Sequence, residues 1–256
     1  MNWIYFSPHI DDAALSCGGL IFQQSQAGET VQIWTLCAGD PPAGPLTPFA
    51  ELLHDRWKLG REAAGQRRLE DLDSCARLCA FPRHFPMPDC IYRRSEVDGA
   101  PLYPTEEAIF ARLHPEEESQ VSLLAARLAL QLPPEVQLVS PLAVGNHVDH
   151  QFTRRALERL GRPLWYYPDF PYAEKESGFF DDLSQAGWRK QEFPLSPAAL
   201  EAWGDAIAAH RSQMSTFWED EAGMRSALQA YSETQGGVRL WRPPEKKRPG
   251  GVRVQK

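Results

Sequence analysis

The chain has 256 residues, of which 43% are hydrophobic and 24% are charged. These proportions are ordinary for a globular protein and exclude a disordered or fibrous chain. The formal net charge of −7 argues against nucleic acid as a partner, because nucleic-acid binding requires a basic face.

Signals for export and membrane insertion are lacking in the sequence. No apolar stretch approaches the ~20 residues of a membrane span, and the chain starts with an apolar strand rather than the basic region of a signal peptide. We therefore expect no membrane span and a cytoplasmic location. The five cysteines have no paired short spacings, so no disulfide framework is predicted. Cys75 and Cys79 are four apart on a predicted helix, where core packing is the expected role.

The beginning of the chain has the pattern of a βαβ unit. Residues 3–7 form an apolar, aromatic run of strand character, a helix is predicted over 13–27, and residues 30–37 predict a second strand. A strand, a helix and a strand in this order predict a parallel sheet with a right-handed crossover.

A loop and a long helical tract follow. Residues 38–48 are rich in proline and glycine and leave the carboxyl end of the second strand, the edge at which open α/β sheets bind ligands. The helical tract covers residues 49–80, with a break expected near Gly60 or Gly65. Its apolar residues at helical spacing predict the face that packs on the sheet: Leu69, Leu72, Ala76 and Cys79.

Residues 81–118 are predicted to be an irregular insertion, because prolines recur along them. So long a connection within a domain is usually functional or mobile. Its polar side chains Asp89, Tyr92 and Arg93, together with Asp40 from the earlier loop, are candidates for substrate contacts. Purely structural roles for these four residues are the alternative.

The pattern of the beginning then recurs. A helix is predicted over residues 121–131, a short buried strand over 136–139, and a helix that ends near residue 160. His147-Val148-Asp149-His150 lies at the start of this helix, as His9-Ile10-Asp11-Asp12 lies before the first. Because the carboxyl ends of parallel strands share one edge of a sheet, we expect the two clusters to converge.

The remainder of the chain adds less chemistry. Its predicted segments are a strand that begins at Leu164 and ends in an aromatic loop, an excursion over 174–190, an amphipathic helix over 197–217 and its continuation after a bend to Tyr231. His210 on that helix is expected to be structural. We expect one α/β domain over residues 1–241 and a basic, solvated tail with proline and glycine over 242–256.

A metal ion would give the convergence of the two clusters a chemical purpose. Catalytic zinc takes three protein ligands and keeps one position for water. His9, Asp12 and His150 make such a set, and we predict that they bind Zn²⁺ or another divalent transition metal.

The other polar residues of the two clusters fit supporting roles. Asp11 is placed to accept a proton from the attacking water. His147 is placed to donate a hydrogen bond to the oxyanion of a tetrahedral intermediate, and Asp149 to orient one histidine. Either Asp11 or His147 then protonates the leaving amine.

Two alternative interpretations compete with the metal site. Asp11 or Asp12 alone is what a plain helix N-cap looks like, and only the second cluster makes that reading unfavourable. A nonenzymatic nucleotide-binding module would need a glycine-rich loop directly after the first strand, whereas Cys17-Gly18-Gly19 falls inside the predicted helix without the required spacing.

The residues also resemble a known family, the PIG-L (LmbE-like) zinc-dependent N-deacetylases. Pro8-His9-Ile10-Asp11-Asp12 resembles the family's His-Pro-Asp-Asp-Glu signature, and His147-Val148-Asp149-His150 resembles its His-x-Asp-His motif. Further similarities are Arg67-Arg68-Leu69-Glu70, Pro88-Asp89 and Ser212-Gln213. The chain departs from the family pattern at Ile10, Ala13 and Cys79, none of which is a predicted ligand or base.

This resemblance implies a Rossmann-like three-layer sandwich with a mostly parallel sheet and the metal at the carboxyl ends of its strands. It implies the same ligands, base and oxyanion partner as the chemical reading, and hydrolysis of an N-acyl group, usually acetyl on an N-acetylglucosamine-type sugar. The expected partner is therefore a small N-acyl amino sugar or glycoconjugate, and nothing excludes a homo-oligomer. An amidase or deacylase acting on a non-sugar or thiol-conjugate amide would use the same metal with a different pocket.

Overall fold

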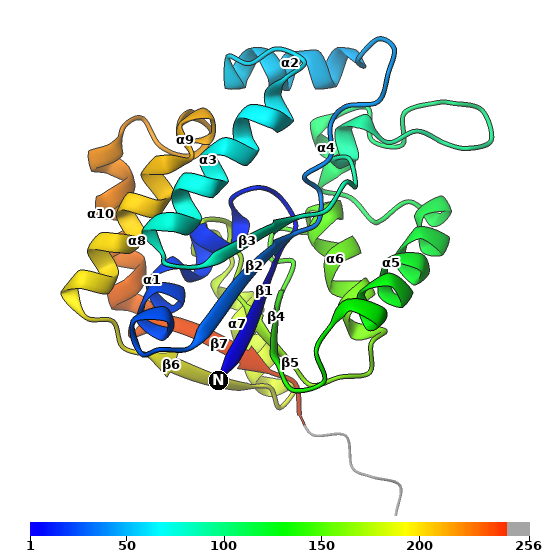
Figure 1. Cartoon of the computed structure of the whole chain (residues 1–256). Helices are drawn as coiled ribbons and strands as arrows, with labels where there is room; N and C mark the ends of the chain where they lie inside the picture. Colours follow the sequence, from blue (N-terminus) through cyan, green and yellow to red (C-terminus); the bar gives the residue numbers. More distant parts are fainter. Residues whose placement is uncertain (245–256) are drawn as a thin grey trace, which may run out of the picture.

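The computed structural model describes residues 1–244, and it folds them around one seven-stranded sheet (Figure 1). The strands form where apolar and aromatic residues concentrate, as in Ile4, Tyr5 and Phe6, which are fully buried. The strands are β1 (Asn2–Ser7), β2 (Thr30–Thr35), β3 (Phe81–His84), β4 (Gln137–Pro141), β5 (Leu164–Tyr167), β6 (Arg189–Phe193) and β7 (Val238–Arg242).

The α-helices alternate with the strands along most of the chain. They are α1 (Asp12–Gln26), α2 (Pro48–Trp57), α3 (Ala63–Arg77), α4 (Glu106–Ile109), α5 (Glu118–Gln131), α6 (Val148–Glu158), α7 (Ser177–Gln185), α8 (Pro197–Ala209), α9 (Arg211–Phe217) and α10 (Glu221–Gln235). Three short 3₁₀ turns join them: η1 (Cys90–Tyr92), η2 (Pro115–Glu117) and η3 (Tyr172–Lys175).

The strand order in the sheet is β3-β2-β1-β4-β5-β7-β6. The strands from β3 to β5 are parallel, whereas β7 runs antiparallel to both of its neighbours. In β1, Ile4 lies beside Gln32 of β2 on one side and Leu138 of β4 on the other. The order reverses between β1 and β4, which makes their carboxyl ends the switch point at which such sheets bind ligands.

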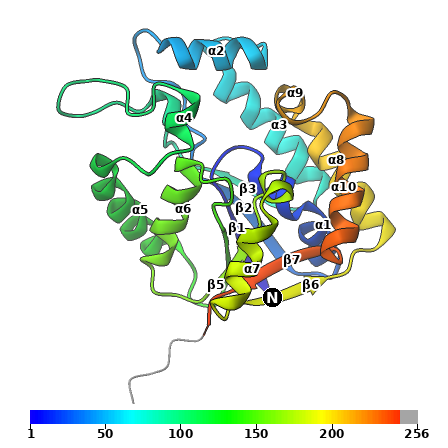
Figure 2. The same ribbon diagram turned by 180° about the vertical axis from the view of Figure 1, so that it is seen from behind.

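The helices form two layers that cover the sheet. In Figure 1, α1, α3 and α8 lie on one face, and α5 and α6 lie on the other; the view from behind in Figure 2 shows the same two layers, with α10 beside α8. This arrangement confirms the predicted three-layer α/β sandwich with a mostly parallel sheet.

Two glycines of α1 have a packing role. A Cβ atom on Gly18 would lie 2.4 Å from Cδ1 of Trp203, and one on Gly19 would lie 2.6 Å from Cδ1 of Leu195. Trp203 is fully buried and donates from Nε1 to the backbone oxygen of Ala14 at 2.8 Å. The glycines therefore let α8 approach α1, which is a structural reason for their position inside the helix.

The predicted elements differ from the structure at the rims of the sheet. Strand β3 lies within the segment predicted to be irregular, and it includes Pro82, which an edge strand tolerates because it has only one paired side. Strand β7, which no pattern in the sequence predicted, extends one residue past the expected domain end at residue 241. Helix α7 and the first two residues of β6 occupy the predicted excursion.

The buried face of α3 corrects a prediction. Leu69 and Leu72, which were predicted to pack on the sheet, are 60% and 46% exposed. Ala76 is exposed as well, and Cys79 lies beyond the helix end and is exposed. The face that is buried is instead largely polar: Ala63, Ala64, Arg67, Glu70, Asp71, Ser74 and Cys75. Its polar side chains have distant partners, among them Asp11 for Arg67 and His84 for Asp71, which offset the cost of burial.

Other boundaries agree with the sequence. Residues 58–62, including Gly60, separate α2 from α3 as expected, and His210 separates α8 from α9 within the predicted helix over 197–217. In the part of the chain that the structure describes, none of the helices has the length and apolar character to cross a bilayer. The predicted basic tail lies outside the described residues, apart from its first three positions.

Candidate active site

The loop after β1 presents its two carboxylates to the site because another residue caps the helix. Ser7 Oγ accepts a hydrogen bond from the backbone N–H of Ala13 at 3.0 Å. Asp11 occupies the N-cap position of α1, yet its side chain makes no capping hydrogen bond. Asp12 Oδ2 accepts from the backbone N–H of His9 at 2.8 Å, so the loop closes on itself and fixes that carboxylate. The plain N-cap reading of Asp11 is therefore not what the structure shows.

The loop after β4 presents two histidines in different ways. His147 is the N-cap residue of α6, and its Nδ1 accepts from the backbone N–H of Asp149 at 3.2 Å. A neutral His147 therefore carries its proton on Nε2 and is a hydrogen-bond donor there. His150 lies one turn further along α6 and is almost fully buried.

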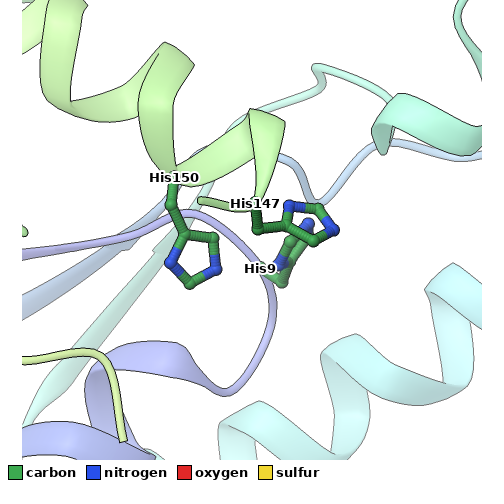
Figure 3. A group of neighbouring side chains, drawn as sticks. All are labelled: His9, His147 and His150. Atoms are coloured by element: carbon green, nitrogen blue, oxygen red, sulfur yellow. The ribbon is translucent and has the colours of Figure 1, made fainter. Parts of the chain in front are cut away.

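The two loops meet as the sequence predicts. In Figure 3, His147 and His150 project from the start of α6 toward His9 on the loop after β1. The ring centroid of His9 lies 4.7 Å from that of His147 and 5.4 Å from that of His150. Asp12 lies between two of the rings, because its Oδ2 is 3.1 Å from His9 Nδ1 and 3.2 Å from His150 Nε2. The structure thus brings together His9, Asp12 and His150.

The hydrogen bonds around the two predicted histidine ligands suit a metal. Nδ1 of His150 donates to Asp169 Oδ1 at 2.6 Å, so the neutral ring carries its lone pair on Nε2. This buried Nε2 faces Asp12 Oδ2 at 3.2 Å. Nε2 of His9 lies 3.0 Å from Asp149 Oδ2, which leaves Nδ1 turned to Asp12. In each ring a carboxylate therefore holds the nitrogen that faces away from Asp12. Metal-binding histidines are commonly oriented in this way.

Other combinations of ligands are less suitable. His9, His147 and His150 each offer an atom within 4.8 Å of the others, and so do Cys90, His147 and Asp149. His147 is disfavoured because its Nδ1 is engaged by α6. Asp149 is disfavoured because Oδ2 accepts from the backbone N–H of Cys90 at 3.0 Å and Oδ1 bonds to Arg93. These hydrogen bonds favour His9, Asp12 and His150 as the candidate ligands.

The two adjacent aspartates have opposite pKa shifts in the metal-free chain. Burial and the neighbouring Asp12 raise the pKa of Asp11, although Arg67 Nη2, 3.6 Å from Asp11 Oδ2, opposes this shift. Burial would also raise the pKa of Asp12, but His150 and then His9 outweigh it and hold that pKa well below its usual range. Environment thus makes Asp12 the better anion and Asp11 the better proton acceptor.

The histidines divide in a similar way. Burial lowers the pKa of His150, but Asp12 and Asp169 outweigh it and raise that pKa to about 10. Burial, with the charges of His9 and His150, holds the pKa of His147 well below its usual range. His147 is therefore neutral and keeps the Nε2 proton that a donor to an oxyanion needs.

The four candidates for substrate contacts are in different surroundings. Asp89 lines the cavity, and its Oδ2 lies 3.7 Å from Nε2 of His9. Tyr92 is buried with its hydroxyl 2.5 Å from His54 Nε2. Arg93 is half-buried and forms ion pairs with Glu117 and Asp149. Asp40 is exposed and pairs with Arg68 at 2.9 Å. For Tyr92, Arg93 and Asp40 the structure therefore supports the structural alternative, since their side chains already have partners away from the cavity.

The structure adds residues that the sequence reasoning missed. Asp169, which fixes His150, follows strand β5 at the same edge of the sheet as the two clusters, and this position was the signal that could have revealed it. Arg67 and Gln213 line the cavity beside Asp11. Both residues belong to motifs that resemble the family pattern, but the sequence assigned them no role, because their relation to the site depends on how α3 and α9 pack.

A cavity of about 490 Å³ opens over the clusters. Its polar lining includes His9, Asp11, Asp12 and His147, with Asp89 beside them. Its apolar lining comes from α2, α4, α9 and the loop after β5: Phe49, Leu53, Trp57, Ile109, Phe110, Tyr172, Phe217 and Trp218. The volume and mixed lining are typical of a site for a small organic molecule.

The fold and the site together define an α/β protein with a candidate divalent-metal centre at the switch point of a parallel sheet. The sequence matches the family model of PIG-L, GlcNAc-PI de-N-acetylase, over residues 4–160. The chain belongs to this family, as the motifs predicted. The matched segment contains both clusters, from His9 to His150.

Relatives and solved structures agree with this assignment. The 2′-N-acetylparomamine deacetylase of Niallia circulans is 29% identical over 246 residues, covering 86% of this chain and 83% of that protein. The crystal structure of the zinc-inhibited form of teicoplanin deacetylase Orf2 has a TM-score of 0.79 and 26% identity, covering 96% of this chain and 100% of that one. The A40926 pseudoaglycone deacetylase Dbv21 has a TM-score of 0.70 and 27% identity, covering 93% and 95%. The class of this chain is that of a hydrolytic N-deacetylase.

Proposed function

We propose that this chain is a zinc-dependent N-deacetylase that removes an acetyl group from an amino sugar within a glycoconjugate. The observation that carries the proposal is the oriented pair of ring nitrogens, His9 Nδ1 and His150 Nε2, on either side of Asp12 Oδ2. His9, Asp12 and His150 would hold the metal. Tetrahedral zinc with these three ligands keeps a fourth position for water or substrate.

The chemistry follows from the residues around that centre. Zinc bound there would polarise the amide carbonyl and lower the pKa of its water to about 7. Asp11 accepts the proton of the attacking water, which its raised pKa favours. His147 donates from Nε2 to the carbonyl oxygen as negative charge develops on it. Asp11 returns that proton, or His147 gives its own, to the leaving nitrogen as the C–N bond breaks, and the products are acetate and a free amine.

The substrate class rests on the relatives and on the cavity. One relative is named for 2′-N-acetylparomamine and another for teicoplanin, both of which are glycoconjugates. A cavity of about 490 Å³ accommodates a sugar together with part of the group attached to it. Asp89 is proposed to contact the sugar, and Asp149 and Asp169 to orient His9 and His150.

Turnover and metal content test the proposal together. Purified protein should contain about one zinc per chain, and the zinc-loaded protein should release acetate from N-acetyl amino sugars but not from matched thiol-conjugate or non-sugar amides. His9→Ala and Asp12→Ala should lose both metal and turnover. Full metal occupancy in both variants would contradict the ligand assignment, and preferred turnover of the non-sugar amides would contradict the substrate class.

A cytoplasmic location, a homo-oligomeric state and the lack of a nucleic-acid partner stay predictions from the sequence. Gel filtration coupled to light scattering would measure the oligomeric state directly. The outcome does not alter the site, because every residue assigned to it comes from one chain.

A further inference from the structure

A chain of hydrogen bonds joins helix α3 to the wall of the cavity. The backbone N–H of Ser212 donates to the Glu70 carboxylate, with N–O distances of 3.2 and 3.3 Å, and Ser212 Oγ donates to Glu70 Oε2 at 2.7 Å. Nε2 of Gln213 lies 3.0 Å from Ser212 Oγ. Glu70 and Ser212 are buried, and Gln213 lines the cavity.

The order of donors in this chain fixes the orientation of the Gln213 amide. A carboxylate only accepts hydrogen bonds, so the single hydroxyl proton of Ser212 is directed to Glu70. Ser212 Oγ can then only accept from Gln213, which must turn its NH₂ group to the serine. A reversed amide would place its oxygen against an oxygen that has no proton left to donate. The amide oxygen of Gln213 is therefore directed away from the serine, and no donor among residues 1–244 bonds to it.

The position of this amide relates it to the reaction. Gln213 lines the cavity together with Asp11 and Arg67. Arg67, one turn before Glu70 on α3, lies 3.6 Å from Asp11 Oδ2. Glu70 thus ties the helix that carries Arg67 to the helix that carries Gln213. The hydrogen bonds between Glu70 and Ser212 therefore set the distance between Asp11 and the Gln213 amide.

We propose that Glu70 and Ser212 are positioning residues, and that they hold Gln213 with its amide oxygen available to accept a hydrogen bond from a hydroxyl group of the substrate sugar. The proposal rests on the proposed function for the identity of the ligand. It assigns a common purpose to two sequence motifs, Arg67-Arg68-Leu69-Glu70 and Ser212-Gln213, that the metal chemistry leaves unexplained. A site that presents a fixed acceptor selects a substrate that carries a donor at that position.

A double-mutant cycle, in which the protein and the substrate are each altered, tests the contact between the Gln213 amide oxygen and a sugar hydroxyl. Initial rates are measured for wild type and Gln213→Met, which keeps the length of the side chain but loses the acceptor. The substrates are an N-acetyl amino sugar and its monodeoxy analogues. On one analogue, kcat/KM of wild type should be about 10-fold lower than on the parent sugar. On the parent sugar, kcat/KM of Gln213→Met should be lower than that of wild type by the same factor. Gln213→Met should then show equal kcat/KM on the parent and on that analogue. Independent, additive losses for every analogue would overturn the proposal.

Variants of Ser212 and Glu70 test the positioning. Ser212→Ala and Glu70→Gln free the amide to reverse, so the discrimination against the deoxy analogue should shrink while zinc content stays unchanged. Ser212→Thr keeps the hydroxyl and should keep the discrimination. Loss of activity in Ser212→Ala that is equal on all sugars would indicate a purely structural role and contradict the proposal.

Failure of the proposed function gives a different result. If zinc-loaded wild type releases no acetate from any sugar, the same cycle is measured by calorimetric binding of the parent sugar and its analogues. Coupling between Gln213 and one hydroxyl in binding supports the present inference while the proposed reaction fails. Equal affinities of wild type and Gln213→Met for every sugar overturn the inference.

Discussion

The loops after β1 and β4 are built alike but use their side chains differently. Each loop leaves a parallel strand and leads into a helix, and each presents a pair of identical residues, Asp11 with Asp12 and His147 with His150. In both pairs one member lies at the shared centre and the other beside it. Asp12 and His150 face each other at 3.2 Å, whereas Asp11 lies by Arg67 and His147 caps a helix.

This comparison indicates that surroundings, and not residue type, distinguish the proposed roles of the two members of each pair. The neighbouring histidines favour the anionic form of Asp12, and burial with a neighbouring charge disfavours it in Asp11. A carboxylate fixes the lone pair of His150, and a backbone N–H fixes the tautomer of His147. Replacing each member of a pair in turn should therefore separate the loss of metal binding from the loss of catalytic rate.

The aspartate pair should give the largest separation. Asp11→Asn keeps the size of the side chain but removes the proton acceptor, so kcat should fall about 10²- to 10⁴-fold with zinc retained. Asp12→Asn should lose zinc as well as activity. Metal analysis and initial rates on the same preparations check both variants. An unaffected rate in Asp11→Asn would remove Asp11 as the base.

The histidine pair should separate less strongly. His147→Asn keeps a side-chain acceptor for the N-cap of α6 but loses the donor to the oxyanion, and kcat should fall about 10²- to 10³-fold with zinc retained. His150→Asn should lose zinc. Thermal unfolding of His147→Asn serves as a control, because an unchanged midpoint shows that the cap is intact. A variant with a wild-type rate would rule out the oxyanion role.

The carboxylate behind His150 should have a smaller effect. Asp169→Asn weakens the hydrogen bond that holds Nδ1, so zinc affinity should fall about 10- to 100-fold. Asp71→Asn is a matched control, since Asp71 Oδ2 holds His84 Nε2 at 2.7 Å in a pair outside the cavity. Competition with a chelator measures both variants. Equal affinities in the two would show that Asp169 does not orient a ligand.

The smallest effect concerns pH. His150 has a pKa raised to about 10 in the metal-free chain, so it is protonated at neutral pH and must release that proton to bind zinc. Zinc affinity should therefore rise with pH below that pKa, by up to about 10-fold per unit for this proton. Calorimetry in buffers of different ionisation enthalpy counts the protons released. Zinc binding without proton release would contradict the assignment of His150.

Much of the fold and of the site can be predicted from the sequence, because it depends on patterns within short segments of the chain. The alternation of strands and helices follows from periodicity, and the convergence of the two clusters follows from the shared edge of parallel strands. The polar face of α3 was predicted the wrong way round, because Leu69 and Leu72 have the spacing of a buried stripe. The partners that bury Glu70 lie 142 residues away in sequence, and no local pattern reports them.

The same limit explains the other differences. Strand β7 is one strand of an antiparallel rim whose pairing depends on β6, and β6 is short and mostly exposed. Asp169 has a local signal, its place after a parallel strand, but its partner His150 lies 19 residues earlier, and no pattern in the sequence joins the two. Local sequence patterns therefore do not predict which polar residues pair when they lie far apart in the chain.

The central claim is that the two loops share one metal ion through His9, Asp12 and His150. Anomalous diffraction from a zinc-loaded crystal locates the ion directly. The account predicts an ion about 2.0–2.2 Å from His9 Nδ1, an Asp12 carboxylate oxygen and His150 Nε2, with His147 outside the coordination sphere. An ion held by His147, or by Asp89 and Asp149, would contradict it.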